Sequence, residues 1–154
     1  MTIMRKNLLL ASLLLVCGAA SANDTLVVTG EKAKGGTAIA LDYASSGSAT
    51  GFQFKIAIPG GDKAKVNLSG CLKGLPATHA GVCQMTKGIV IGMAYSDSNA
   101  LLPAGMLSLG TIGVSGASGQ APSVIEFLAA DQAGNKIATN LEMGSAAVEK
   151  NLAQ

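Results

Sequence analysis

Apolar and polar residues alternate along most of the chain with the two-residue period that is typical of β-strands. Residues 51–58 show it most clearly, because Phe52, Phe54, Ile56 and Ile58 share one phase and polar or small residues share the other. Successive side chains of a strand point to opposite faces of its sheet, so we expect this segment to turn its aromatic side into a core. No segment of the domain carries a convincing 3.6-residue period, and the pattern therefore predicts an all-β protein.

Turns rich in glycine, serine, proline and asparagine separate the other segments of this kind. Further strands are predicted at residues 25–29, 37–43, 65–68, 82–85, 89–95, 105–114, 123–130 and 136–139. About nine short strands without a long helix predict a two-sheet β-sandwich. Residues 141–154 place apolar residues among Glu and Lys without a strand pattern, so we expect a C-terminal tail or a short helix there.

Residues 88–114 hold two of these strands and are expected to form a hairpin or strand pair at the core. In the first strand, the apolar phase carries larger side chains than the opposite phase, which is mostly small. We therefore predict that the larger set faces the core: Ile89, Ile91, Met93 and Tyr95.

The second strand of this pair changes phase along its length. Leu107 and Leu109 share one phase, whereas Ile112 belongs to the other. Gly110 lies at the change, where a strand can take a β-bulge without a side-chain clash. The sequence therefore predicts a bulge at Gly110.

The aromatic residues are few and fall on apolar phases. There is no tryptophan. The residues expected in the core on this basis are Tyr43, Phe52, Phe54, Tyr95 and Phe127, with Ile125 and Ala129 in the phase of Phe127. Flat polysaccharide surfaces are gripped by exposed aromatic rings, so this distribution argues against a crystalline-cellulose binder while leaving open a hydrogen-bonding cleft for one glycan chain.

The first 22 residues have the pattern of a secretory signal peptide. Arg5 and Lys6 precede an apolar run of 13 residues at 8–20, which is too short to span a bilayer, and Ala20-Ser21-Ala22 provides a small-residue cleavage site. We predict that residues 1–22 are removed and that the protein is exported to the periplasm or out of the cell. No second apolar segment long enough to cross a membrane follows the predicted signal.

The charge of the predicted mature domain is balanced. Two of the 11 basic residues lie in the signal, which leaves nine basic residues against nine acidic ones. A nucleic-acid-binding domain carries a basic patch, and none is visible in this sequence. We therefore expect no nucleic-acid partner.

Three cysteines are present, and two are expected to form a disulfide. Cys17 is expected to be lost with the signal rather than lipidated, because Val16 and not a small residue precedes it. In an exported protein the remaining pair, Cys71 and Cys83, indicates a structural disulfide. A metal pair would need more ligands than His79 adds, and a redox pair would have the shorter Cys-x-x-Cys spacing. His79 itself is expected to be a surface-loop residue.

No pattern in the sequence selects a chemical reaction. The acidic residues are scattered singly, so no pair of carboxylates is selected for glycoside hydrolysis. Ser115 and Ser118 do not fit the Gly-x-Ser-x-Gly motif of a nucleophilic serine. The glycine-rich stretch at 110–119 fits neither the dinucleotide-binding spacing nor the P-loop spacing. We therefore predict that the protein is not an enzyme. Asp131 and Asn135 lie in a turn and could offer oxygen ligands to calcium. An Asx turn is the favoured interpretation of this segment. No cofactor is expected.

The order of segments resembles the cohesin domain, which belongs to the superfamily that also holds several bacterial carbohydrate-binding modules. Four stretches carry the likeness, over roughly residues 26–137: Gly35-Gly36-Thr37 with the strand after it, residues 51–59, residues 88–114, and residues 124–135 with their Asp-x-x-Gly-Asn turn. The resemblance implies a jelly-roll-like sandwich of about nine strands and a non-catalytic role, in which one sheet face binds a dockerin module on another protein. The disulfide-closed loop between Val66 and Gly88 departs from the family pattern.

The expected layout is a signal peptide at 1–22, a cohesin-like β-sandwich at 23–140 and a tail or short helix at 141–154. The main hypothesis is an exported protein–protein interaction module whose partner is dockerin-like or another exported protein. The alternative is a carbohydrate-binding module that takes a polysaccharide, and a third possibility is self-association through an edge strand. The candidate binding residues lie on the polar phase of residues 51–58, at the end of the strand at 89–95 and on the polar loop after it: Gln53, Lys55, Tyr95, Asp97 and Asn99.

Overall fold

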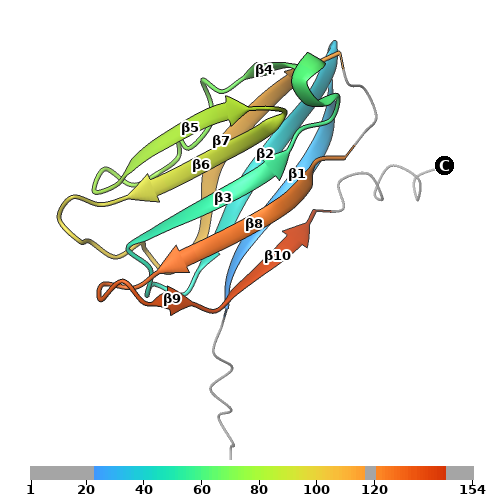
Figure 1. Ribbon diagram of the computed structural model, residues 1–154. Coiled ribbons are helices and arrows are strands. Elements are labelled where there is room, and N and C mark those ends of the chain that lie inside the picture. Colours follow the sequence, from blue (N-terminus) through green and yellow to red (C-terminus); the bar gives the residue numbers. More distant parts are fainter. Residues whose placement is uncertain (1–22, 117–120, 145–154) are drawn as a thin grey trace, which may run out of the picture.

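A computed structural model describes residues 23–116 and 121–144 and shows two five-stranded sheets packed face to face (Figure 1). Its only helical element in these residues is one 3₁₀ turn, η1 (Gly61–Lys63). The predicted all-β two-sheet sandwich is therefore confirmed, with ten strands in the described residues where about nine were expected. The predicted signal peptide and the last ten residues of the predicted tail lie outside the described residues.

Each sheet joins strands that are far apart in the sequence. The first sheet has the order β10 (Thr139–Met143), β1 (Asp24–Ala33), β2 (Gly36–Ser45), β7 (Gly105–Ser115) and β4 (Lys65–Asn67). The second sheet has the order β5 (Ala80–Thr86), β6 (Ile89–Tyr95), β3 (Gly51–Ala57), β8 (Ser123–Ala130) and β9 (Lys136–Ile137). All neighbours are antiparallel except β1 and β10, which run parallel.

The core lies between the sheets and is filled by the alternating apolar side chains of their inner faces. Tyr43 lies 4.9 Å from Phe52 and 5.6 Å from Phe127 between ring centroids, so an aromatic cluster joins the two sheets. The predicted core positions of Tyr43 and of the three phenylalanines are thus confirmed. The most deeply buried aliphatic residues are Leu26, Val28, Ile39, Leu41, Ile56, Val90, Leu102, Leu109 and Ile112.

The predicted bulge in β7 is confirmed. The register of β2 against β7 shifts between Leu41 and Asp42, opposite Gly110. Gly110 has a φ of 125°, and a Cβ there would lie 2.1 Å from the carbonyl oxygen of Gly70. The position therefore requires glycine both for its backbone conformation and for the close approach of the neighbouring loop.

The predicted pairing of the two strands in residues 88–114 is wrong. β6 lies in the second sheet and β7 in the first, so the connection at 96–104 crosses from one layer to the other. Leu102 anchors this crossing, because its side chain is buried and its N–H donates to the Ala49 carbonyl at 2.7 Å. Alternation in sequence reports which side of a strand is apolar, and it does not report which strand is its neighbour.

The predicted inward phase of β6 is also wrong. Its buried residues are Val90, Gly92 and Ala94, whereas Met93 and Tyr95 are exposed by 44% and 40%. The larger side chains of this strand therefore point away from the core.

The reason is the aromatic strand next to β6. Phe54 pairs with Gly92, and a Cβ at residue 92 would lie 2.1 Å from the Phe54 ring. The ring occupies the space that a side chain of β6 would otherwise fill, so the core needs the small face of β6 and not its large one.

In β8 the prediction is correct for Phe127 and Ala129, which are buried, and wrong for Ile125, which is 54% exposed. Lys55 pairs with Glu126, but the next residue of β3 pairs with Val124. Ile125 is thus the extra residue of a bulge. The bulge changes the phase of β8, and Val124 packs against the core in its place.

The expected change to a tail or helix at residue 141 is wrong for residues 141–143. They belong to β10, in which Leu141 pairs with Leu26 and Met143 pairs with Val28. Parallel pairing with a distant strand leaves no local sequence signal, so the prediction placed the end of the domain too early.

The predicted disulfide between Cys71 and Cys83 is confirmed, with a Cα–Cα distance of 6.3 Å. It ties the loop at 68–79 to β5. The same loop is fastened to β7 in the other sheet, because Thr111 N–H donates to the Gly70 carbonyl and Gly74 N–H donates to the Leu109 carbonyl, both at 3.1 Å. The disulfide therefore connects the two sheets along one side of the sandwich.

Candidate binding surface

The second sheet presents exposed apolar side chains next to charged ones. Its outward-pointing residues come from four neighbouring strands, and we call them the outer face. The outer face includes Gln53 and Lys55 of β3, Val82 of β5, Ile91, Met93 and Tyr95 of β6, and Glu126 of β8. β-Pairing fixes their spacing, so the surface is held in place by the sheet.

The apolar part of the outer face runs across β5 and β6. Val82 pairs with Met93, and the two side chains are 45% and 44% exposed. Tyr95 lies two residues further along the same side of β6 and is 40% exposed. Single exposed apolar residues are common on protein surfaces, but a contiguous group of them indicates an interaction site.

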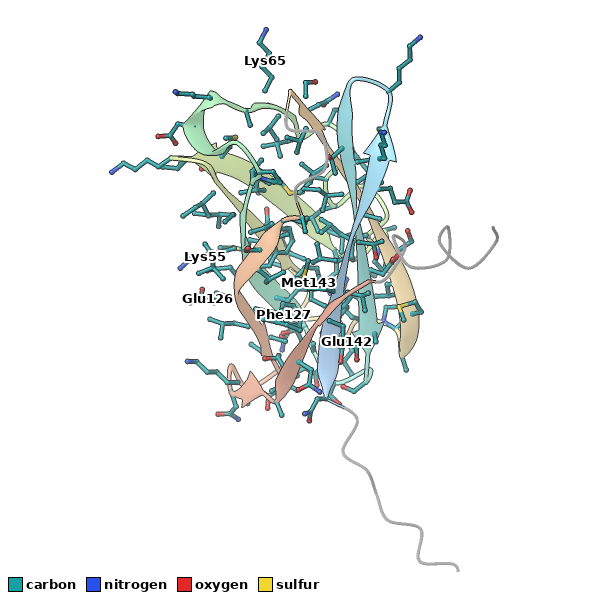
Figure 2. All side chains as sticks on the ribbon, turned by 90° about the vertical axis from the view of Figure 1, so that its right-hand side faces the viewer. Lys55, Lys65, Glu126, Phe127, Glu142 and Met143 are labelled. Atoms are coloured by element: carbon teal, nitrogen blue, oxygen red, sulfur yellow. A yellow bond between two sulfur atoms is a disulfide. The ribbon has the colours of Figure 1, made fainter. Side chains whose placement is uncertain are left out.

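A polar strip borders this apolar part on β3 and β8. Lys55 Nζ lies 3.1 Å from Glu126 Oε1, and Gln53 Nε2 donates to the same carboxylate oxygen at 3.2 Å. Figure 2 shows Lys55 and Glu126 together outside the second sheet, whereas Phe127 lies between the sheets. Both charged side chains are about one-third exposed, so the pair contributes only ~0–1 kcal/mol to stability and remains available to a partner.

Three of the predicted binding residues are brought together on the outer face, and two are not. Gln53 and Lys55 are adjacent outward residues of β3, and Tyr95 ends β6. Asp97 and Asn99 lie on the loop beyond Tyr95 and are exposed.

Asn99 has a structural role in that loop. Its Nδ2 donates to the Gln132 carbonyl at 3.2 Å, and Gln132 Nε2 donates to the Asn99 carbonyl at 3.1 Å. Asn99 also has a φ of 55°, a left-handed conformation that asparagine tolerates better than most residues. These contacts hold the crossing connection against the turn after β8.

The sequence interpretation missed Val82, Ile91, Met93 and Glu126 as outer-face residues. Ile91 and Met93 were assigned to the core because they are the large residues of their strand. The available signal was Gly92 between them, since a glycine in a strand often marks the close approach of a neighbouring group.

The turn at 131–135 is an Asx turn, as its sequence predicts. The Asp131 carboxylate accepts hydrogen bonds from the N–H groups of Ala133 and Asn135 at 2.9 and 2.8 Å. The Asn135 N–H is the main group that lowers the pKa of Asp131. Within residues 23–116 and 121–144, no three His, Cys, Asp or Glu side chains are grouped so that they could hold a metal ion.

His79 is not the surface-loop residue that was expected. It is only 9% exposed, its Nε2 lies 3.1 Å from the Thr50 carbonyl oxygen, and its Nδ1 lies 2.9 Å from Thr78 Oγ1. The carbonyl requires a donor, so Nε2 carries the proton and donates to it. The ring therefore ties the loop at 68–79 to the segment before β3 and has a structural role.

In the described ranges, no helix has the length and apolar character needed to cross a bilayer. No protein-family model and no curated protein matches the sequence.

Solved structures of cohesins are similar to this fold. A non-cellulosomal cohesin from Archaeoglobus fulgidus matches with a TM-score of 0.61 and 13% identity, over 86% of this chain and 99% of that one. A type II cohesin from Acetivibrio cellulolyticus, solved in a complex with an X-dockerin, matches with a TM-score of 0.56 and 12% identity, over 79% and 97% of the two chains. Type II cohesin A11 from Bacteroides cellulosolvens matches with a TM-score of 0.54 and 9% identity, over 78% and 95%. The fold of this chain is therefore cohesin-like.

Proposed function

We propose that this protein is an exported, non-catalytic module that binds another exported protein through the outer face of its second sheet. The observation that carries the proposal is the contiguous apolar group of Val82, Met93 and Tyr95 beside the Lys55–Glu126 pair. Protein interfaces combine an apolar centre, enriched in methionine and tyrosine, with a polar rim. The similarity to a cohesin solved with an X-dockerin supports a protein partner for this fold.

The composition of the outer face favours a protein over a polysaccharide. Tyr95 is its only aromatic residue, whereas a flat glycan is held by several stacked rings. Val82 and Met93 instead offer aliphatic surface, and methionine adapts to irregular partner surfaces. Because β-pairing already orders the backbone beneath these side chains, binding costs little conformational entropy.

Export rests on two observations. Residues 1–22 have the pattern of a signal peptide, and the Cys71–Cys83 disulfide is of the kind that persists in oxidising compartments. The module would therefore work in the periplasm or outside the cell. Its partner is a dockerin-like module or another exported protein that shares this compartment.

The test is affinity capture from the periplasmic and secreted fractions with the oxidised mature protein as bait. Met93→Glu places a charge at the centre of the outer face and is expected to abolish capture. Met106→Glu is the matched control, because Met106 is 65% exposed on β7 of the opposite sheet. The control should retain the same partner as the wild type.

Two results would overturn the proposal. One is that no protein is retained by the wild type, and the other is that both variants bind the partner equally well. A glycan array run in parallel decides the alternative, since glycan binding that is lost in Tyr95→Ala would replace the protein partner by a polysaccharide.

A further inference from the structure

The edge strands of the two sheets differ in how well they are protected. An edge strand exposes unpaired backbone N–H and C=O groups, and native proteins protect such edges with charges, short lengths or covering segments. Among the described residues, three of the four edges follow this rule. β4 has three residues and carries Lys65, β9 has two and carries Lys136, and β10 has five and carries Glu142. In Figure 2 Lys65 extends away from the end of the fold.

β5 is longer than the other three edge strands and has no charged residue. It has seven residues with the sequence AGVCQMT, which contains neither a charged residue nor a proline. Its described pairing is with β6 alone, and Figure 1 shows it as the outermost strand of its sheet. Five of its residues are exposed, and these are Ala80, Gly81, Val82, Gln84 and Thr86.

The disulfide anchors this edge. Cys83 is the central residue of β5, and its bond to Cys71 ties the strand to the loop that is fastened to the first sheet. An edge that is already extended and fixed loses little conformational entropy when a further strand pairs with it. β5 is therefore an ordered template for strand addition.

We propose that β5 pairs antiparallel with β5 of a second copy of this chain, which joins the two second sheets into one ten-stranded sheet. A two-fold axis at Cys83 sets Val82 opposite Gln84 of the other copy and Gly81 opposite Met85 of the other copy. Such an interface is isologous, because the same strand is used on both sides. No like charges meet, since the strand has none.

The balanced charge of the domain also favours a second copy. Outside the predicted signal there are nine basic and nine acidic residues, so two copies do not repel each other at long range. Val82 lies at the shared edge beside Met93 and faces Gln84 of the other copy, so the apolar parts of the two outer faces lie diagonally on either side of the axis.

This inference goes beyond the proposed function, because Met93 and Tyr95 lie on β6 and remain exposed in the dimer. Two outer faces would point to the same side of one sheet. A partner with two docking segments would then be bound with higher avidity than either face alone provides.

The test is sedimentation equilibrium of the oxidised mature protein over a range of concentrations. The wild type is expected to dimerise reversibly. Gln84→Lys adds a charge to the exposed side of β5, and we expect it to weaken the dimer by at least about tenfold. Asn140→Lys is the control, because it adds the same charge to an exposed position of β10, the edge strand of the other sheet, and should leave the dimer unchanged.

Hydrogen exchange of the wild type provides a second measurement that does not depend on a variant. Amides of β5 should exchange more slowly in concentrated than in dilute protein, whereas those of β10 should not change. The proposal is overturned if the wild type stays monomeric up to its solubility limit, if both variants weaken the dimer equally, or if β5 shows no added protection. None of these results affects the capture experiment with Met93→Glu, so the two proposals fail independently.

Discussion

The two open sides of the sandwich are closed in different ways. On one side the loop at 68–79 covers the gap between β7 and β5, and the Cys71–Cys83 disulfide holds it there. On the other side the chain passes from β9 in the second sheet to β10 in the first, where β10 pairs with β1. Figure 1 shows β9 and β10 together at one side and β4 and β5 toward the other.

The side closed by the disulfide has no continuous secondary structure of its own, yet it buries apolar side chains. Leu72 is 5% exposed and Cys71 is 8% exposed. The β10 side is ordered by backbone pairing but remains open, because Leu141 and Met143 are 46% and 50% exposed. A covalent bond therefore secures the side on which the backbone offers few hydrogen bonds, while a hydrogen-bonded ladder secures the side on which few apolar contacts form.

A buried polar pair adds to the second side. Asp24 is fully buried, and its N–H donates to the Ala138 carbonyl at 3.1 Å. Its carboxylate accepts hydrogen bonds from the Tyr43 hydroxyl and, at 2.9 Å, from the Ser46 N–H. The start of β1 is thereby tied to β2 and to the chain that leads into β10.

Removal of the disulfide is expected to have the largest effect. Cys71→Ser with Cys83→Ser should lower the free energy of unfolding by about 3 kcal/mol, because the loop it closes is no longer restrained in the unfolded chain. Urea denaturation of the oxidised wild type and of the variant measures the difference. The reduced wild type is the control and should match the variant; equal stability of oxidised and reduced protein would contradict the prediction.

The same truncation on each side tests the difference in burial. Leu72→Ala on the disulfide side should cost about 3 kcal/mol, because it leaves a cavity between the loop at 68–79 and β5. Leu141→Ala on the β10 side should cost about 1 kcal/mol, since about half of that side chain already faces water. Thermal and urea unfolding of the two variants provide the comparison, and costs that are equal or reversed would show that the two sides are equally well packed.

Loss of the Tyr43 hydroxyl tests its buried hydrogen bond to the Asp24 carboxylate. Tyr43→Phe should lower stability by about 2 kcal/mol, because it removes a hydrogen bond to a buried carboxylate. Tyr95→Phe is the matched control on the exposed outer face and should change stability by less than about 0.5 kcal/mol. If the two variants are equally stable, the buried hydroxyl does not support the fold.

Alkaline pH sharpens this test. Burial, together with the hydrogen bond to Asp24 and its charge, raises the pKa of Tyr43. The folded protein therefore keeps this phenol protonated, whereas the unfolded chain ionises it above pH ~10. The stabilisation that the protonated Tyr43 hydroxyl gives to the folded state is complete below that pH and is lost as the pH rises further. The free energy of unfolding of the wild type should therefore fall more steeply at alkaline pH than that of Tyr43→Phe.

Much of the fold follows from local pattern. The inner phases of β2 and β3 were predictable, and so was the bulge at Gly110, because each depends on residues that are near one another in the chain. The disulfide was predictable because the predicted mature chain holds two cysteines, so each has one available partner. The parallel pairing of β10 with β1 was not predictable, since it joins residues more than 100 positions apart and has no local signature.

The outer face was only partly predictable for a related reason. Gln53 and Lys55 are polar residues of a clearly alternating strand, so they were placed correctly. The outward phase of β6 depends on which strand lies beside it, because Phe54 fills the space over Gly92. Alternation alone therefore assigns the large residues of β6 to the core, although Phe54 of the neighbouring strand fills that space.

That arrangement of Phe54 and Gly92 has a consequence for how such a protein can diverge. The core requires only the small side of β6, formed by Val90, Gly92 and Ala94, so it places no demand on the opposite side of the strand. Mutations at Ile91, Met93 and Tyr95 can accumulate without repacking the interior. A lineage that conserves Phe54 and Gly92 together can thus change the chemistry of its outer face by surface substitutions alone.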